Sequence, residues 1–206
     1  MILEGLAVTP SPAGRPHLAP LGAVWPDDAG PDRGDRFTLR PYEGSRTCGN
    51  LLRAGRGVWH TTDDAVLIAR SAAGLPGLED EDVTFARDPR TGLHVLMPCQ
   101  DWWAFEVVER AGPDARGMHT LTAEVTARGG ARASRGFCRA SHALVEAAIL
   151  CSRVRFFPRA ELDRRLADLA PLVAKTGTPR DRAAWADVCR VIGERAAADE
   201  VERADG

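Results

Sequence analysis

The chain has 206 residues, of which 44% are hydrophobic and 27% charged, a composition typical of a globular protein rather than a disordered one. Its formal net charge of −2 gives no basic surplus for neutralising phosphates, so we expect no nucleic-acid partner. The first residues lack a basic leader, and no apolar run approaches the roughly 18 residues of a membrane span. These features predict a cytoplasmic protein without a membrane segment.

The first third of the chain has the pattern of strands. Residues 2–9 and 17–25 are two strand-like runs, and the turn-forming residues 10–14 between them predict a hairpin. Residues 26–35 are polar and rich in Gly, Pro and Asp, which predicts an exposed loop. A third strand is expected over residues 36–41.

Two short helices interrupt the strands. Ser45 has a side chain that can cap a helix N-terminus, and Gly55 is a residue type that commonly ends helices, which predicts a helix over residues 46–54. A strand over residues 58–61 and a second helix over residues 64–73 follow.

The middle of the chain returns to strands after an irregular stretch. Apolar periodicity lapses over residues 75–91, which predicts a loop that can act as a lid. Strands are expected over residues 93–97, 102–109 and 119–128. About seven strands in all favour a closed or nearly closed antiparallel barrel.

The last third is helical. The apolar period changes from two to about 3.6 after Gly136, which predicts three amphipathic helices. We expect Pro171 to disturb the second, Thr178 to cap the third, and the charged tail after Ala198 to fray. The chain is therefore expected to be α+β, with a barrel over residues 1–136 and a helical region over residues 137–206.

Two motifs suggest a ligand. The first, residues 14–22, is a turn followed by a strand that contains Pro20 and Gly22. Proline leaves a gap in strand hydrogen bonding and glycine lets a ligand approach the backbone, but a protected edge strand has the same features.

The second motif is a turn that enters the predicted helix of residues 46–54. A helix N-terminus with a preceding glycine, hydroxyl side chains and a guanidinium is sufficient to bind a phosphate. A capped surface helix with a solvated arginine is the alternative. The residues concerned are Arg40, Gly44, Ser45, Arg46, Thr47 and Asn50.

Together the segments GRPHLAPLG, RPYEGSRTCGNL and GVWHTTDD resemble, in this order, the FMN-binding split-barrel superfamily of flavin reductases. Within it they are most similar to the uncharacterised, flavoprotein-like domain of unknown function family 447. The later segment FCRASHALVEAAILCSR resembles the C-terminal helix of that group, so the likeness spans residues 2–153.

The resemblance implies a homodimeric split barrel of six or seven strands with one FMN in each of two clefts between subunits. Ser45, Arg46 and Thr47 would hold the phosphate, with Arg40 beside them and Asn50 nearby. The isoalloxazine edge would lie along Pro20, Leu21 and Gly22.

Three positions depart from the pattern of that group. Cys48 and Gly49 replace larger residues in the phosphate turn, and His60 stands where the group usually has asparagine. The five cysteines lack CxxC spacing, which favours reduced thiols and no metal site.

Three function classes fit these features. The first is an FMN-dependent oxidoreductase of unknown substrate, the second a flavin-binding carrier or sensor without turnover, and the third a structural dimer that has lost its cofactor. No catalytic acid or base can be identified. Trp102 or Trp103 is a reasonable guess for the dimer interface.

Overall fold

The computed structural model describes residues 1–26, 30–75, 83–97, 99–130, 133, 136 and 138–204. The chain forms two compact units: Met1–Thr62 with Glu81–Ser134, and Asp63–Asp80 with Arg135–Gly206. The predicted division between residues 136 and 137 is a single cut in the sequence. The structure instead groups a helix from the middle of the chain, α3, with the C-terminal helices.

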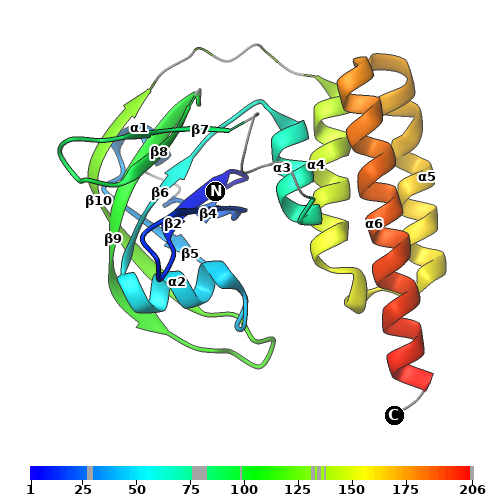
Figure 1. Ribbon diagram of the computed structural model, residues 1–206, viewed down its shortest axis with the longest axis horizontal. Coiled ribbons are helices and arrows are strands. Elements are labelled where there is room, and N and C mark those ends of the chain that lie inside the picture. The colour runs from blue at the N-terminus through cyan, green and yellow to red at the C-terminus, as the bar shows by residue number, and fades with distance from the viewer. Residues whose placement is uncertain are drawn as a thin grey trace. The chain divides into compact units, whose positions relative to one another are not determined.

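The first unit is built on a curled, fully antiparallel sheet of eight strands (Figure 1). Its order is β1-β4-β5-β10-β9-β6-β2-β3, so two N-terminal strands form the edges. The strands are β1 (Ile2–Leu3), β2 (Leu6–Pro10), β3 (Pro16–Pro20), β4 (Ala23–Val24), β5 (Arg36–Leu39), β6 (Arg56–His60), β9 (Asp101–Ala111) and β10 (Thr120–Gly130). The predicted hairpin of the first two runs is confirmed as β2 and β3.

The two faces of this sheet carry separate cores because successive side chains of a strand point to opposite sides. In β9, Trp103 and Phe105 belong to the inner cluster, and Trp102 and Ala104 to the outer one. The helix α2 (Arg46–Ala54) contributes Leu51 to the inner cluster. The outer cluster includes Val95 of the hairpin β7 (Thr84–Arg87) and β8 (His94–Met97).

The two tryptophans guessed for an interface are buried within this unit. Trp103 is 6% exposed and its indole N–H donates to the Pro31 carbonyl at 3.2 Å. Trp102 is 8% exposed, and a Cβ built on its cross-strand neighbour Gly129 would lie 2.7 Å from the Trp102 ring. Neither ring is left to face a partner, so this guess is wrong.

Two predicted loops contain regular structure. Within residues 26–35 a single helical turn, α1 (Gly30–Arg33), forms, and the Pro31 bond to Trp103 anchors it. Within residues 75–91, β7 is a strand because it pairs with β8, a contact that local sequence does not reveal. Residues 27–29 and 76–82 lie outside the described residues, and so does that part of the predicted lid.

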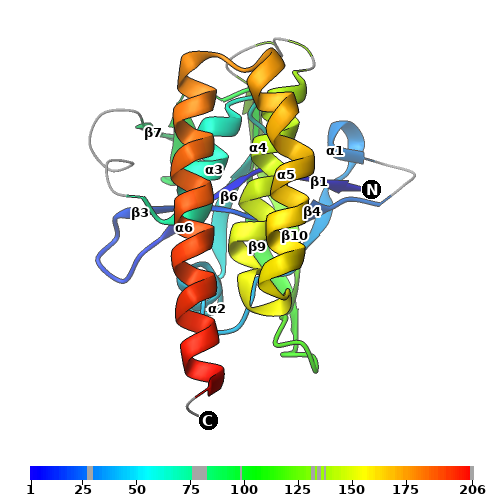
Figure 2. The ribbon, with the colours of Figure 1, turned by 90° about the vertical axis from the view of Figure 1, so that its right-hand side faces the viewer.

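The second unit consists of helices that lie side by side (Figure 2). Buried apolar side chains on their facing sides, among them Leu144, Leu162, Val188 and Ile192, form its core. The helices are α3 (Ala65–Ala73), α4 (Arg139–Ser152), the short 3-10 helix η1 (Val154–Phe156), α5 (Arg159–Thr176) and α6 (Pro179–Ala204).

Two expectations for these helices are corrected. α5 continues through Pro171. Pro171 has no N–H to donate to the Ala167 carbonyl, but both residues are exposed, so water can solvate that carbonyl. α6 continues through the charged tail to Ala204, since Ala-rich sequence and an Arg190–Glu194 pair at 2.8 Å favour helix.

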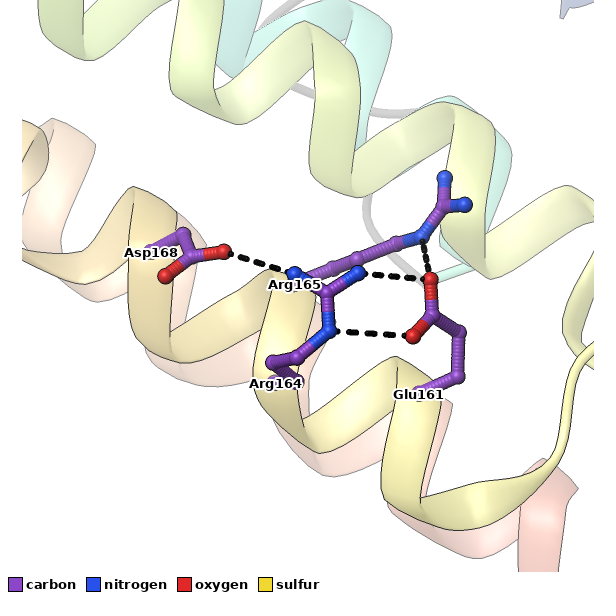
Figure 3. A network of polar contacts seen from close by, with 4 residues as sticks. All are labelled: Glu161, Arg164, Arg165 and Asp168. Carbon is purple, nitrogen blue, oxygen red and sulfur yellow. Dashed lines mark hydrogen bonds and ion pairs between the residues drawn. The ribbon is translucent and has the colours of Figure 1, made fainter.

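The exposed face of α5 carries a network of ion pairs (Figure 3). The Glu161 carboxylate accepts from Arg164 Nη2 at 2.8 Å and from Arg165 Nε at 2.7 Å. Hydrogen bonds from these two guanidinium groups lower the pKa of Glu161 to about 2. The network is local to one helix, so we assign it to helix stability rather than to a site.

Candidate functional site

The turn before α2 builds a well-formed helix start. Gly44 has φ +79°, a left-handed conformation that glycine adopts without strain. Ser45 then caps the helix: its Oγ accepts from the Cys48 N–H at 3.1 Å and its hydroxyl donates to the Tyr42 carbonyl at 2.7 Å. The Ser45 side chain is therefore engaged within the protein.

Beyond the cap, the start of α2 is exposed at Arg46, whereas Thr47 is buried. Arg46 and Thr47 occupy the first two helical positions, whose N–H groups have no partner within the helix. The first turn contains no acidic residue. Across the described part of the chain, no hydrogen-bond or ion-pair partner is found for the exposed Arg46 guanidinium. Helix dipole and guanidinium together make this end electropositive.

A polar seam fixes α2 to the β2–β3 hairpin. Thr9 of β2 and His17 of β3 are cross-strand partners, and Thr47 and Asn50 are three residues apart on one face of α2. Thr47 Oγ1 lies 3.4 Å from His17 Nε2, and the Asn50 amide donates to Thr9 Oγ1 at 3.0 Å. The structure thus brings the two sequence motifs together.

The residues of this seam differ in their roles. Asn50 and Thr9 are both buried and satisfy each other, so Asn50 holds the helix in place. His17 is half-buried beside Thr47 and was missed as a site residue. Only the cross-strand register of Thr9 and His17 reveals it, and register is hard to derive from a single sequence.

Arg40 is engaged elsewhere in the same loop system. Its Nη2 lies 2.8 Å from Asp114 Oδ2, and Asp114 Oδ1 accepts from the Arg116 and Met118 N–H groups. These two backbone hydrogen bonds, more than the Arg40 charge, lower the pKa of Asp114. Arg40 therefore ties the β9–β10 connection to the segment before α2, where the Glu43 N–H also donates to the Gly117 carbonyl at 2.8 Å.

The segment Pro20–Leu21–Gly22 continues from β3. The Leu21 N–H donates to the Gly5 carbonyl at 3.0 Å, and the Leu21 carbonyl accepts from Trp59 Nε1 at 2.7 Å. A Cβ built on Gly22 would lie 3.4 Å from the Glu4 carboxylate. This segment is held firmly, and β3 is the element that connects it to His17 and the start of α2.

His60, one of the three departures, is buried and structural. The Leu96 N–H donates to His60 Nε2 at 3.0 Å, so Nδ1 carries the proton and donates to the Leu6 carbonyl at 3.2 Å. Burial lowers the pKa of His60 to about 4. A neutral His60 thus joins β2 and β6 to β8.

The two best-formed depressions of the described surface lie away from α2. One in the helical unit is about 210 Å³, and one in the sheet unit is about 250 Å³. Both are smaller than usual ligand pockets of about 300 Å³ or more. The second is lined by Arg56, Arg90, Thr91, Leu93, Phe105, Glu106 and Thr126.

All five cysteines are free thiols. The described residues include no group of three or more His, Cys, Asp or Glu side chains placed to hold a metal ion. None of their helices is long and apolar enough to cross a membrane.

Comparison with protein families gives two matches. A model described as the N-terminal domain of a protein of unknown function (DUF447) matches residues 3–129. A second model of the same family matches residues 138–190. The two models together span most of the chain.

Solved structures share the fold. An FMN-bound DUF447 protein from Methanosarcina mazei aligns with TM-score 0.74 and 20% identity over 92% of this chain and 94% of that one. A putative flavin reductase with a split barrel domain from Shewanella frigidimarina aligns with TM-score 0.51 and 11% identity, over 61% of this chain and 65% of its own.

A nitrilotriacetate monooxygenase component B homolog from Mycobacterium thermoresistibile gives TM-score 0.52 and 12% identity over 66% and 73% of the two chains. The fold is therefore the predicted α+β split barrel with C-terminal helices. Its main sheet has eight strands rather than six or seven, because the predicted runs 2–9 and 17–25 each divide into two strands, and the short β1 and β4 pair at one edge.

Proposed function

Because the chain belongs to the DUF447 family, we propose that it is an FMN-binding flavoprotein and that the start of α2 holds the FMN phosphate. The family relative from Methanosarcina mazei is FMN-bound and shares the fold over most of both chains, which supports this proposal. Bound FMN would supply hydride or electron transfer, and the chain would supply position and electrostatics.

The observation that carries the proposal is the open, electropositive start of α2. A cation at a helix N-terminus is unfavourable for the helix itself, because it faces the positive end of the dipole. Arg46 nevertheless stands there without a protein partner among the described residues. A phosphate would accept from the Arg46 guanidinium and from the open N–H groups, which removes this conflict.

The residues present fit a phosphate monoester in kind and number. Arg46 offers a planar, bidentate donor, and Thr47 offers a hydroxyl and a backbone N–H. Ser45 supports the site through its cap, Asn50 by fixing the helix, and Arg40 by fixing the adjoining loop. Pro20, Leu21 and Gly22 remain our proposed contacts for the flavin ring.

We further propose that the protein is a homodimer in which a second copy completes the flavin site. A tricyclic ring needs a deep cleft, and neither of the two best-formed depressions of the described surface lies at α2. FMN bound between two copies would raise the melting temperature and favour association. Light scattering that shows a monomer with stoichiometric FMN would contradict this placement.

The proposed function is tested by comparing FMN with riboflavin, which lacks the phosphate. We expect FMN to bind about a hundredfold more tightly in a flavin-fluorescence titration, the value of roughly two charge-assisted hydrogen bonds. Arg46→Ala should remove most of that preference and leave the fold intact. Arg56→Ala is the matched control, since Arg56 is another exposed arginine with no partner found in the described chain.

Equal affinities for FMN and riboflavin would refute the phosphate site. A purified protein that is colourless and does not take up added FMN would instead favour a structural dimer that has lost its cofactor.

For the reaction, we propose a flavin-dependent oxidoreductase of unknown substrate. A non-catalytic flavin carrier or sensor is the second candidate, favoured by one observation. His60 stands where the resembling group usually has asparagine. Its burial and its hydrogen bonds keep it neutral, so it is unable to act as an acid. Anaerobic reduction with NADH or NADPH, followed by a screen of acceptors, distinguishes the two: turnover requires reduction, and a carrier would show none.

A further inference from the structure

His17 faces the start of α2 from the neighbouring strand. It is paired with Thr9 across the β2–β3 hairpin, and the side chains of such a pair lie on the same face of the sheet. Thr9 contacts Asn50 and His17 contacts Thr47, so both histidine and threonine of this hairpin point toward α2. The imidazole therefore lies within 3.4 Å of a hydroxyl that we assign to the phosphate site.

The contact links the ionisation of His17 to the use of the Thr47 hydroxyl. A hydroxyl has one proton to donate, and an unprotonated imidazole nitrogen can accept it. When the ring carries two protons, Nε2 must donate to Thr47 Oγ1, and the hydroxyl proton is then available to an anion. Protonation thus adds a positive charge and releases a second donor at the same place.

The charged groups around His17 favour an anion there. β2 carries no ionisable side chain, and α2 carries Arg46, Arg53 and the buried thiol of Cys48. Arg15 precedes His17 in the hairpin turn. On the acidic side, burial and the exposed Glu43 together raise the pKa of the Cys48 thiol, so Glu43 also acts at the start of α2.

We propose that His17 is a specificity-determining residue that reads the ligand's phosphate: its protonated ring adds a second cation beside Arg46 and turns the Thr47 hydroxyl toward the anion. This inference rests on the proposed function of the α2 start. It means that the contribution of His17 to the preference for a phosphorylated flavin increases as the pH falls through the range in which histidine titrates.

The test compares wild-type protein with His17→Gln, which keeps a hydrogen-bonding side chain but carries no charge. FMN and riboflavin are titrated against both from pH 8.5 to pH 6. At pH 6 we expect His17→Gln to bind FMN about tenfold more weakly than wild type, and at pH 8.5 less than about twofold more weakly. Riboflavin affinity should be the same for both proteins.

The comparison between variants is necessary because the phosphate itself gains a proton near pH 6, which weakens binding to any cation. That effect is common to both proteins and cancels in their ratio. His142→Gln, which replaces an exposed histidine of α4, is the control for general effects of losing an imidazole side chain. When both proteins also carry Thr47→Val, the ratio of their FMN affinities should depend less on pH, since the substitution removes the hydroxyl that His17 controls.

The outcomes separate the two proposals. A tenfold loss confined to low pH and to FMN supports the role of His17. An FMN preference that His17→Gln retains at every pH overturns that role and leaves the phosphate site standing. Equal binding of FMN and riboflavin by wild-type protein overturns both. If His17→Gln also weakens riboflavin binding, the residue is structural and the inference is again wrong.

Discussion

Two helices of this chain have the same length and opposite electrostatics at their starts. α2 and α3 are each nine residues long, each has a side-chain cap, and each ends at a left-handed glycine. α3 begins with Asp64, whose carboxylate caps the Leu67 N–H at 3.0 Å and lies 3.0 Å from Arg180. α2 begins with the neutral Ser45 and then Arg46.

The difference shows what distinguishes a structural helix start from a binding one. At α3 the protein supplies its own anion, and a cation from α6 balances that anion in turn. At α2 the cap is made, but the first turn has no acidic residue, and no partner for the Arg46 guanidinium is found in the described part of the chain. A cap residue alone therefore does not identify a site, and our proposal of a phosphate site at α2 depends on the missing negative charge.

The largest effect is expected from making α2 resemble α3. Aspartate caps as well as serine, so Ser45→Asp should change the free energy of unfolding by no more than about 1 kcal/mol. Its carboxylate would lie next to the proposed phosphate position and repel the anion, so FMN affinity should fall by roughly a hundredfold, about 2.7 kcal/mol. Thermal melting and flavin titration measure the two. Undiminished FMN affinity would show that the anion site lies elsewhere.

The next effect concerns a histidine whose polar groups are all satisfied within the protein. The pKa of His60 is about 4 in the folded chain, against about 6.5 for an unfolded histidine. Between these values the unfolded state binds more protons, so stability falls as the pH falls. We expect the free energy of unfolding to be about 2 kcal/mol lower at pH 5 than at pH 7.5.

Urea unfolding of the wild-type protein and of His60→Asn at the two pH values isolates the contribution of His60 to this loss of stability. The variant is expected to be less stable overall, but its free energy of unfolding should fall less on acidification. If this free energy falls by the same amount in both proteins, other groups cause the pH dependence.

The smallest effect is expected from the reverse exchange at α3. Asp64→Ser keeps a cap and removes the partly exposed pair with Arg180, so stability should fall by less than about 1 kcal/mol. FMN affinity should not change, because no phosphate binds there. A loss of FMN binding in this variant would mean that the contrast between the two helix starts has been misread.

Much of the fold could be predicted where the signals are local. The bounds of α2 agree with the prediction, since Ser45 and Gly55 mark both ends in the sequence itself. Elements that depend on distant partners were missed. β7 becomes a strand only by pairing with β8, and α1 is anchored by a bond to Trp103, 72 residues away.

The site divides in the same way. The capped helix start beside Arg46 could be predicted, because Ser45 and Arg46 are adjacent in the sequence, and its use as a phosphate site stays a prediction. The direction in which each side chain points could not be predicted. Asn50 turns inward to Thr9, and Arg40 is paired with Asp114, 74 residues later. Which residues meet at the start of α2 depends on how the helix docks, and docking is a tertiary property.

The position of α3 in the sequence constrains how this protein can be shortened or recombined. Its apolar residues, Ala65 to Ala69 among them, are buried, and the backbone carbonyl of Ala73 at its end accepts from Arg195 of α6 at 2.9 Å. A chain that stopped before α4 would retain α3 without its cover and would expose a continuous apolar stripe to solvent and proteases. The C-terminal helices are thus no removable appendage, and gene fusion or exchange at residue 137 is expected to yield an insoluble product.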